Sequence, residues 1–187
     1  MITLDPPRSV VDDADPWQTL GLSASGLARF LNRARTAVGL TGVVHVLLAD
    51  DATLKRLNRT FRGKNKATDV LSFPAGDNGS GVAGDLAISL ETAARQAAQF
   101  GHSLRDEVRV LLLHGTLHLA GFDHEADRGE MAAREAVLRR ELRVATSLIA
   151  RVTHGVATGK ADSSASLRND KQKSKRIDRQ NSKRGRA

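Results

Sequence analysis

One stretch of the sequence, residues 103–119, constrains the fold more than any other. It reads SLRDEVRVLLLHGTLHL, and Ser103 and Asp106 in it match the capping box that starts a helix. Apolar side chains then occupy most sides of that helix, so little polar surface is left for solvent. We therefore predict a central, mostly buried helix through Leu119 that the rest of the chain must cover.

The elements predicted around this helix are short strands and capped helices. The strands are expected at residues 2–4, 43–49, 69–74 and 85–89, with a loop or hairpin turn over 75–84. The other helices are expected at residues 26–38, 52–60, 90–99 and 126–149, with caps at Ser25, Asp50 or Asp51, and Ser89, and ends at Gly39, Gly63 and Gly101. This order predicts an α+β (α/β-type) fold, a single small domain over residues 1–150. It has one mixed sheet of about four strands packed by about five or six helices.

The charge of the chain is unevenly distributed. Residues 1–150 hold as many Lys and Arg as Asp and Glu, so the whole net charge of +8 lies in residues 151–187. This segment is poor in large apolar residues, so we expect a basic, disordered C-terminal tail. Such a tail is either an arm that meets RNA phosphates or a solubilising extension.

The chain has no cysteine, which excludes a disulfide framework and any thiolate metal site. A metal would have to be held by His, Asp or Glu. The N-terminus lacks the basic and apolar regions of a secretory signal, and the apolar runs are too short to span a bilayer. We therefore expect a cytoplasmic protein with no membrane contact.

Three of the six histidines lie in the stretch HGTLHLAGFDH. His114 and His118 are four residues apart, so both imidazoles lie on one face of the predicted central helix. Gly121 suits a left-handed turn that returns His124 to the same point. Three imidazoles with an open fourth position are the arrangement of a catalytic zinc site, so the central helix is expected to carry a metal.

The spacing of these histidines is also that of the metzincin proteases. Those enzymes carry a glutamate directly after the first histidine as the general base. Here that residue is Gly115, so the sequence does not support peptide hydrolysis.

Three motifs resemble those of the YbeY family, bacterial metal-dependent endoribonucleases of ribosomal RNA maturation. HGTLHLAGFDH is similar to the family's H-G-x-L-H-L-x-G-[YF]-D-H, LNRTFRGKNKATDVLSFP to its L-N-x-x-[YF]-R-x-x-x-x-x-T-D-V-L-S-F-P, and GDLAIS to its G-D-[IL]-x-I-[SC]. They occur in family order, and the resemblance covers roughly residues 40–150. Ala67 departs from the family, which usually has proline there, and the tail lies outside the resemblance.

The resemblance implies that His114, His118 and His124 bind one zinc ion and that Arg62 is catalytic. A guanidinium suits this role because its fork of donors matches the phosphate oxygens that gain charge in the transition state. Zinc would activate a water or polarise a phosphoryl oxygen, and either water or the RNA 2′-hydroxyl could attack. No residue is identified as the general base.

Other residues near the motifs have weaker interpretations. Lys64 and Lys66 are candidates for RNA binding through their charge. Asp85 could orient a ligand imidazole or cap a strand, and Asp123 could orient a ligand, bind the metal or, as favoured, form a turn. Phe61 and Phe73 are expected in the core, and the 3% aromatic content argues against a base-stacking platform.

The function implied by the resemblance is zinc-dependent, single-strand-specific cleavage of RNA in small-subunit ribosomal RNA 3′-end maturation and ribosome quality control. The implied partners are single-stranded ribosomal RNA, the small ribosomal subunit and assembly factors. Two alternatives stay open: a ribosome-assembly factor with a structural zinc, and a hydrolase similar to zinc metallopeptidases. The oligomeric state, the cleavage site and the physiological metal do not follow from the sequence.

Overall fold

The computed structural model describes residues 1–5, 15–76, 81–124 and 126–144. The predicted basic tail, residues 151–187, lies outside the described residues, as do the last residues expected for the final helix. None of the helices in the described ranges is long and apolar enough to cross a membrane.

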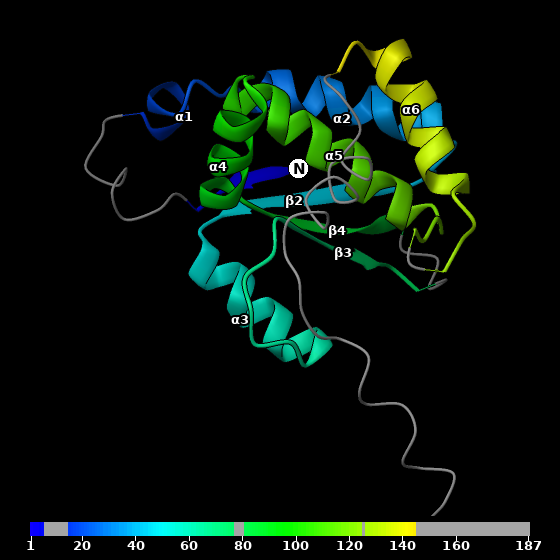
Figure 1. The fold of residues 1–187 in the computed structure, drawn as a ribbon, viewed down its shortest axis with the longest axis horizontal. Helices are drawn as coiled ribbons and strands as arrows, with labels where there is room; N and C mark the ends of the chain where they lie inside the picture. Colours follow the sequence, from blue (N-terminus) through cyan, green and yellow to red (C-terminus); the bar gives the residue numbers. More distant parts are fainter. Residues whose placement is uncertain (6–14, 77–80, 125, 145–187) are drawn as a thin grey trace, which may run out of the picture. The chain divides into compact units, whose positions relative to one another are not determined.

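The fold contains one mixed sheet of four strands, as predicted, with helices on both of its faces (Figure 1). The strands are β1 (Ile2–Leu4), β2 (Val43–Ala49), β3 (Val70–Pro74) and β4 (Val82–Ser89), in the spatial order β1-β2-β4-β3. The first three in that order run parallel, and β3 pairs antiparallel with β4 at one edge. β4 begins at Val82, three residues earlier than predicted, because the end of the expected loop continues the ladder with β2.

The described residues form six helices, of which five were predicted. The helices are α1 (Pro16–Thr19), α2 (Ala24–Val38), α3 (Asp51–Arg62), α4 (Leu90–Phe100), α5 (Leu104–Leu119) and α6 (Glu130–Leu142). The short α1, capped by Asp15, was not predicted.

The local hydrogen bonds explain where the helices begin and end. Asp50, Ser89 and Ser103 cap their helices as expected, but α2 is capped by Ser23 rather than Ser25 because the Ser23 hydroxyl accepts from the Gly26 amide. α6 begins at Glu130, not near 126, because the residues before it form turns anchored on Asp127.

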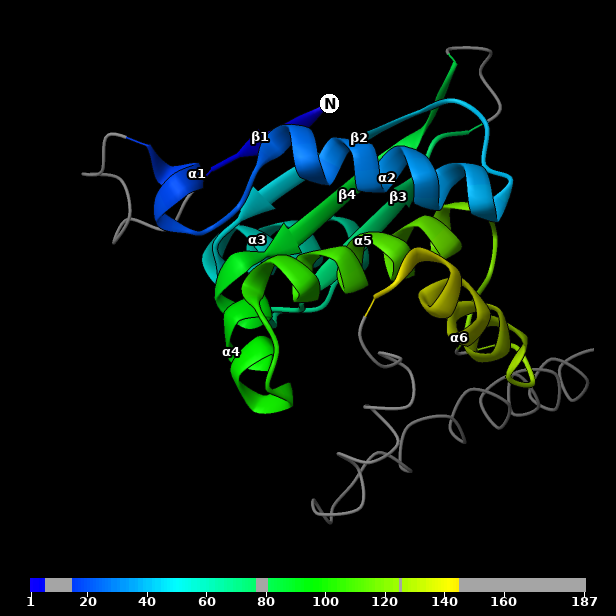
Figure 2. The ribbon, with the colours of Figure 1, turned by 90° about the horizontal axis from the view of Figure 1, so that it is seen from above.

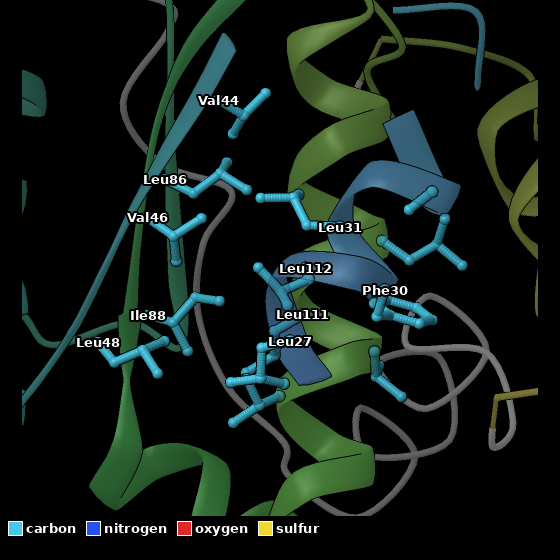
Figure 3. Packing of buried hydrophobic residues seen from close by; sticks show 14 of the residues in the cluster. Leu27, Phe30, Leu31, Val44, Val46, Leu48, Leu86, Ile88, Leu111 and Leu112 are labelled. Carbon is cyan, nitrogen blue, oxygen red and sulfur yellow. The ribbon is translucent and has the colours of Figure 1, made fainter. Parts of the chain in front are cut away.

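Helices α2 and α5 cover one face of the sheet (Figure 2). Val44, Val46 and Leu48 of β2 and Leu86 and Ile88 of β4 point into this layer, where they meet the apolar side chains of both helices (Figure 3). Eleven residues of α5 are buried, which confirms the prediction of a central, covered helix. Because α5 is packed on most of its sides, its position in the fold is fixed, and so are the positions of the side chains at its C-terminal end.

Helix α3 lies on the opposite face of the sheet (Figure 1). A second, smaller core forms there from Leu54 of α3, Leu71 of β3 and Ala87 of β4, with Phe73 packed against it. Side chains alternate between the faces of a strand. Asp85, Ala87 and Phe73 therefore face α3, whereas Leu86 faces α5.

Candidate metal centre

The structure brings together the three histidines singled out from the sequence. His114 and His118 lie one turn apart near the C-terminal end of α5, and Gly121 adopts a positive φ of 89° just beyond it. The chain turns there and returns His124, so that one nitrogen from each ring lies within 4.8 Å of the others. A metal ion could be held between these three nitrogens.

A buried carboxylate fixes the orientation of the first imidazole. Glu135 of α6 lies 3.0 Å from His114 through its Oε2 and the ring Nδ1, and its other oxygen accepts from Arg139 Nε at 2.7 Å. Glu135 and Arg139 are 0% and 3% exposed. An ionised carboxylate only accepts hydrogen bonds, so His114 donates from Nδ1, and in a neutral imidazole this leaves Nε2 with the lone pair that a metal needs. That nitrogen is the one aimed at the other histidines.

The separation between ligand nitrogens fits a shared metal ion. His118 Nε2 lies 3.2 Å from His114 Nε2. Two imidazoles on one tetrahedral zinc, each with a bond of 2.0–2.1 Å, place their nitrogens about 3.3 Å apart. The spacing of the His114 and His118 nitrogens therefore fits a zinc-sized ion, and His124 supplies a third nitrogen within 4.8 Å.

The pKa of His118 favours metal binding at neutral pH. Burial, followed by the neighbouring His114 and His124, lowers this pKa from 6.5 to about 4. The imidazole is therefore neutral at pH 7, and a metal would not have to displace a proton from it.

Gly115 lies where α5 packs tightly against the sheet. A Cβ at this residue would lie 2.7 Å from Leu86 Cδ2 and 3.3 Å from Ser72 Oγ. The Ser72 hydroxyl also donates to the Gly115 carbonyl at 3.4 Å. The sequence lacks a glutamate at this position, and the structure adds that any side chain here would require the Leu86 side chain to shift.

Arg62, Lys64 and Lys66 are not on α5 with the histidines. They lie at and after the C-terminal end of α3, the helix on the opposite face of the sheet. Arg62 is the last residue of α3, the two lysines follow in the loop, and all three are exposed. The Asn58 amide anchors this loop by donating to the Lys66 carbonyl at 2.8 Å. Within the described ranges, no hydrogen bond or ion pair joins Arg62 to the histidines, so its catalytic role stays a prediction.

Among the described residues, Asp85 pairs with His45 rather than with a histidine of the cluster, whereas the sequence suggested either a place beside a ligand imidazole or a strand cap. The Oδ1 atom of Asp85 lies 3.1 Å from Nδ1 of His45, its cross-strand neighbour on β2. The physical reason is the strand alternation, which turns Asp85 away from α5. Asp123 is exposed and its backbone carbonyl accepts from the amides of Ala126 and Asp127, as the turn interpretation expected.

Two further residues of the site, Glu135 and Arg139, were missed at the level of sequence. A signal was available, because Met131, Glu135, Leu138 and Leu142 follow the spacing of one buried helix face. A carboxylate on such a face requires a buried partner, which α5 supplies 21 residues away in sequence.

An α+β scaffold that presents three converging histidines, one of them oriented by a buried carboxylate, is typical of metal-dependent hydrolases. The family model of the endoribonuclease YbeY matches residues 23–143. The chain therefore belongs to the YbeY endoribonuclease family.

Curated relatives named endoribonuclease YbeY agree with this assignment. The protein of Koribacter versatilis (strain Ellin345) is 54% identical over 133 residues, which are 71% of this chain and 86% of that one. The protein of Solibacter usitatus (strain Ellin6076) is 49% identical over 131 residues, 70% of this chain and 87% of the relative. The protein of Aquifex aeolicus (strain VF5) is 45% identical over 116 residues, which are 61% of this chain and 69% of the relative.

Proposed function

We propose that this protein is a zinc-dependent endoribonuclease that hydrolyses phosphodiester bonds of single-stranded RNA. The observation that carries the proposal is the convergence of His114, His118 and His124 on one point, with the His114 ring oriented by Glu135. Membership of the YbeY endoribonuclease family supports RNA as the substrate.

Zinc is the metal that best suits the donor set. Three neutral imidazoles in a chain without cysteine match catalytic zinc sites, in which the fourth position stays open. When bound, the metal would supply an activated water or a polarised phosphoryl oxygen. Glu135 fixes the direction of the His114 ring, and Arg139 donates to the other oxygen of the same carboxylate.

Arg62 is proposed to stabilise charge on the phosphate during cleavage. Arg62 is exposed at the C-terminal end of α3, so its side chain is accessible to a bound strand. Lys64 and Lys66 are proposed to bind neighbouring phosphates and to make the affinity for RNA depend on salt. Water and the 2′-hydroxyl remain alternative nucleophiles, and the product ends distinguish them. A 3′-hydroxyl with a 5′-phosphate would exclude attack by the 2′-hydroxyl.

The cellular role that we propose follows the family: 3′-end maturation of small-subunit ribosomal RNA and ribosome quality control in the cytoplasm. The small ribosomal subunit and assembly factors are the proposed partners. The tail, residues 151–187, carries the net charge of +8 and would add affinity for ribosomal RNA.

Peptide hydrolysis is disfavoured because Gly115 carries no carboxylate to act as the general base, and a Cβ there would lie 2.7 Å from Leu86 Cδ2. A purely structural metal is the other alternative. The buried pairing of His114 with Glu135 ties α5 to α6, so a metal there would also stabilise the fold.

The experiment that tests the proposal is cleavage of an end-labelled single-stranded RNA by the wild type and by His118→Ala. Both proteins are first compared by circular dichroism, with and without a chelator. Cleavage by the wild type and loss of cleavage in a folded variant support a catalytic metal. Equal cleavage by both would reveal a contaminating nuclease and contradict the proposal. If neither protein cleaves and chelation unfolds the wild type, the metal is structural.

A further inference from the structure

Phe61 in the last turn of α3 is exposed, contrary to the expectation that it belongs to the core. Its exposed fraction is 65%, the largest of any aromatic residue in the described ranges. The apolar stripe of α3 continues from Leu54 to Phe61, but only Leu54 is fully covered. The helix therefore presents an aromatic ring to solvent where a surface residue would ordinarily be polar.

The ring of Phe61 is held in place by Phe73 of β3. The two ring centroids lie 5.2 Å apart with an angle of 66° between the planes, an edge-to-face contact. Such a contact fixes the direction of the exposed ring and lowers the entropy that it would lose on binding a ligand.

Basic residues flank Phe61 in the sequence on both sides. Between Asp51 and Asp69 the chain has no acidic residue. The same segment carries six exposed cations, Lys55, Arg56, Arg59, Arg62, Lys64 and Lys66. None of these cations forms an ion pair with another residue in the part of the chain that the structure describes. Asp85 is the cross-strand neighbour of Phe73 on β4, and its carboxylate is paired with His45. The surface is thus suited to a polyanion with flat apolar groups rather than to an apolar protein partner.

The β3 strand connects this surface to the histidine cluster. Its Ser72 side chain points to the Gly115 carbonyl of α5, next to His114, whereas its Phe73 side chain points to Phe61 on the opposite face. β3 is also the edge strand of the sheet, so no further strand separates the two faces. A strand of RNA that crosses this edge would meet both the aromatic ring and the histidines.

Although the low aromatic content argues against an extended base-stacking platform, we propose that the single ring of Phe61 stacks on a nucleobase of single-stranded RNA, with the flanking phosphates held by Arg59, Arg62 and Lys64. This inference rests on the proposed function and adds the source of strand specificity. Only an unpaired base can leave its neighbours and place its face on an aromatic side chain.

The test measures binding of the full-length protein to a fluorescein-labelled, 2′-O-methylated single strand by fluorescence anisotropy, with strand integrity checked on a gel. Phe61→Leu keeps the apolar volume and removes the aromatic face. We expect its Kd to rise about 5- to 150-fold, the range of one lost base stack. Phe61→Trp, which keeps an aromatic face, is expected to bind the strand as tightly as the wild type. The matched control is Phe100→Leu on α4, also an exposed aromatic residue at 37%, which should leave Kd unchanged.

Salt dependence and a spectroscopic signal separate stacking from charge. Phe61→Leu should leave the slope of log Kd against log salt unchanged, whereas Arg59→Ala should lower it by about one. In a Trp17→Phe background, which removes the single native tryptophan, the indole of Phe61→Trp should be quenched by the strand. An abasic strand of the same length should not quench it.

A Kd for Phe61→Leu within twofold of the wild type would overturn the proposal and assign the ring to a protein contact instead. An equal loss of affinity for the abasic strand would also overturn it, because stacking requires bases. The outcome is separable from that of the proposed function. A protein that binds through Phe61 but cleaves no RNA would refute the nuclease proposal alone, and cleavage with an unaffected Phe61→Leu Kd would refute the stacking proposal alone.

Discussion

Removal of the Glu135 carboxylate is the perturbation with the largest effect that the structure predicts. The carboxylate uses one oxygen for His114 Nδ1 at 3.0 Å and the other for Arg139 Nε at 2.7 Å, and all three residues are buried. In Glu135→Ala the guanidinium loses this partner without reaching solvent. Breaking a buried pair in this way costs about 3–5 kcal/mol, which lowers Tm by roughly 10–20 °C for a domain of this size.

The same substitution also frees the His114 ring to rotate or change tautomer. Loss of the partner of a ligand imidazole typically weakens metal binding about 10- to 100-fold. We therefore expect the zinc Kd of Glu135→Ala to rise by this factor in a competition titration against a chromophoric chelator at pH 7. Thermal unfolding followed by circular dichroism gives the stability of the zinc-free protein in parallel.

A double variant, Glu135→Leu with Arg139→Met, separates the two effects. It removes both buried charges and keeps the volume, so stability should return to within about 1–2 kcal/mol of the wild type. Zinc affinity should stay low, because His114 still lacks an acceptor for its Nδ1 proton. Wild-type zinc affinity in this stable double variant would refute the claim that Glu135 positions His114.

Three further predictions follow from the same geometry. Because the pKa of His118 is about 4 when folded and 6.5 when unfolded, the unfolded chain binds more protons between these values. The contribution of His118 to stability is thus complete above pH 6.5 and is lost as the pH falls towards 4. Urea unfolding of the zinc-free protein at pH 7.5 and 5 should show a larger loss for the wild type than for His118→Ala. Gly115→Ala should cost about 1–2 kcal/mol, because overpacking against Leu86 outweighs the gain in helix propensity. A more stable Gly115→Ala in the same assay would show that this contact is loose. Arg62→Ala should lower kcat for RNA cleavage about 100-fold or more with the fold intact, and Arg62→Lys should recover only part of it. Unchanged kcat in Arg62→Ala would remove Arg62 from the mechanism.

The sequence predicts the helices and strands, but it does not predict which side chains of different helices and strands contact one another. The spacing along α6 indicates that Glu135 is buried, but its contact with His114 joins two helices whose relative placement is set by the whole core, so no local pattern identifies the partner. For Asp85, at the start of a predicted strand, the sequence left open a role beside a ligand imidazole and a role as a strand cap. The register of β4, which only the assembled sheet defines, turns Asp85 to the other face.

The sequence by itself determined the local structure around the histidines. Ser103 caps α5, Gly121 allows the turn beyond it, and four-residue spacing places His114 and His118 on one face. Each of these features depends on hydrogen bonds or steric contacts within a few residues, so each can be predicted from the residues next to it in the sequence. The tertiary structure alone decided that Phe61 is exposed and that Glu135 is buried beside His114. Burial depends on which other elements cover a face, and that is a property of the folded whole.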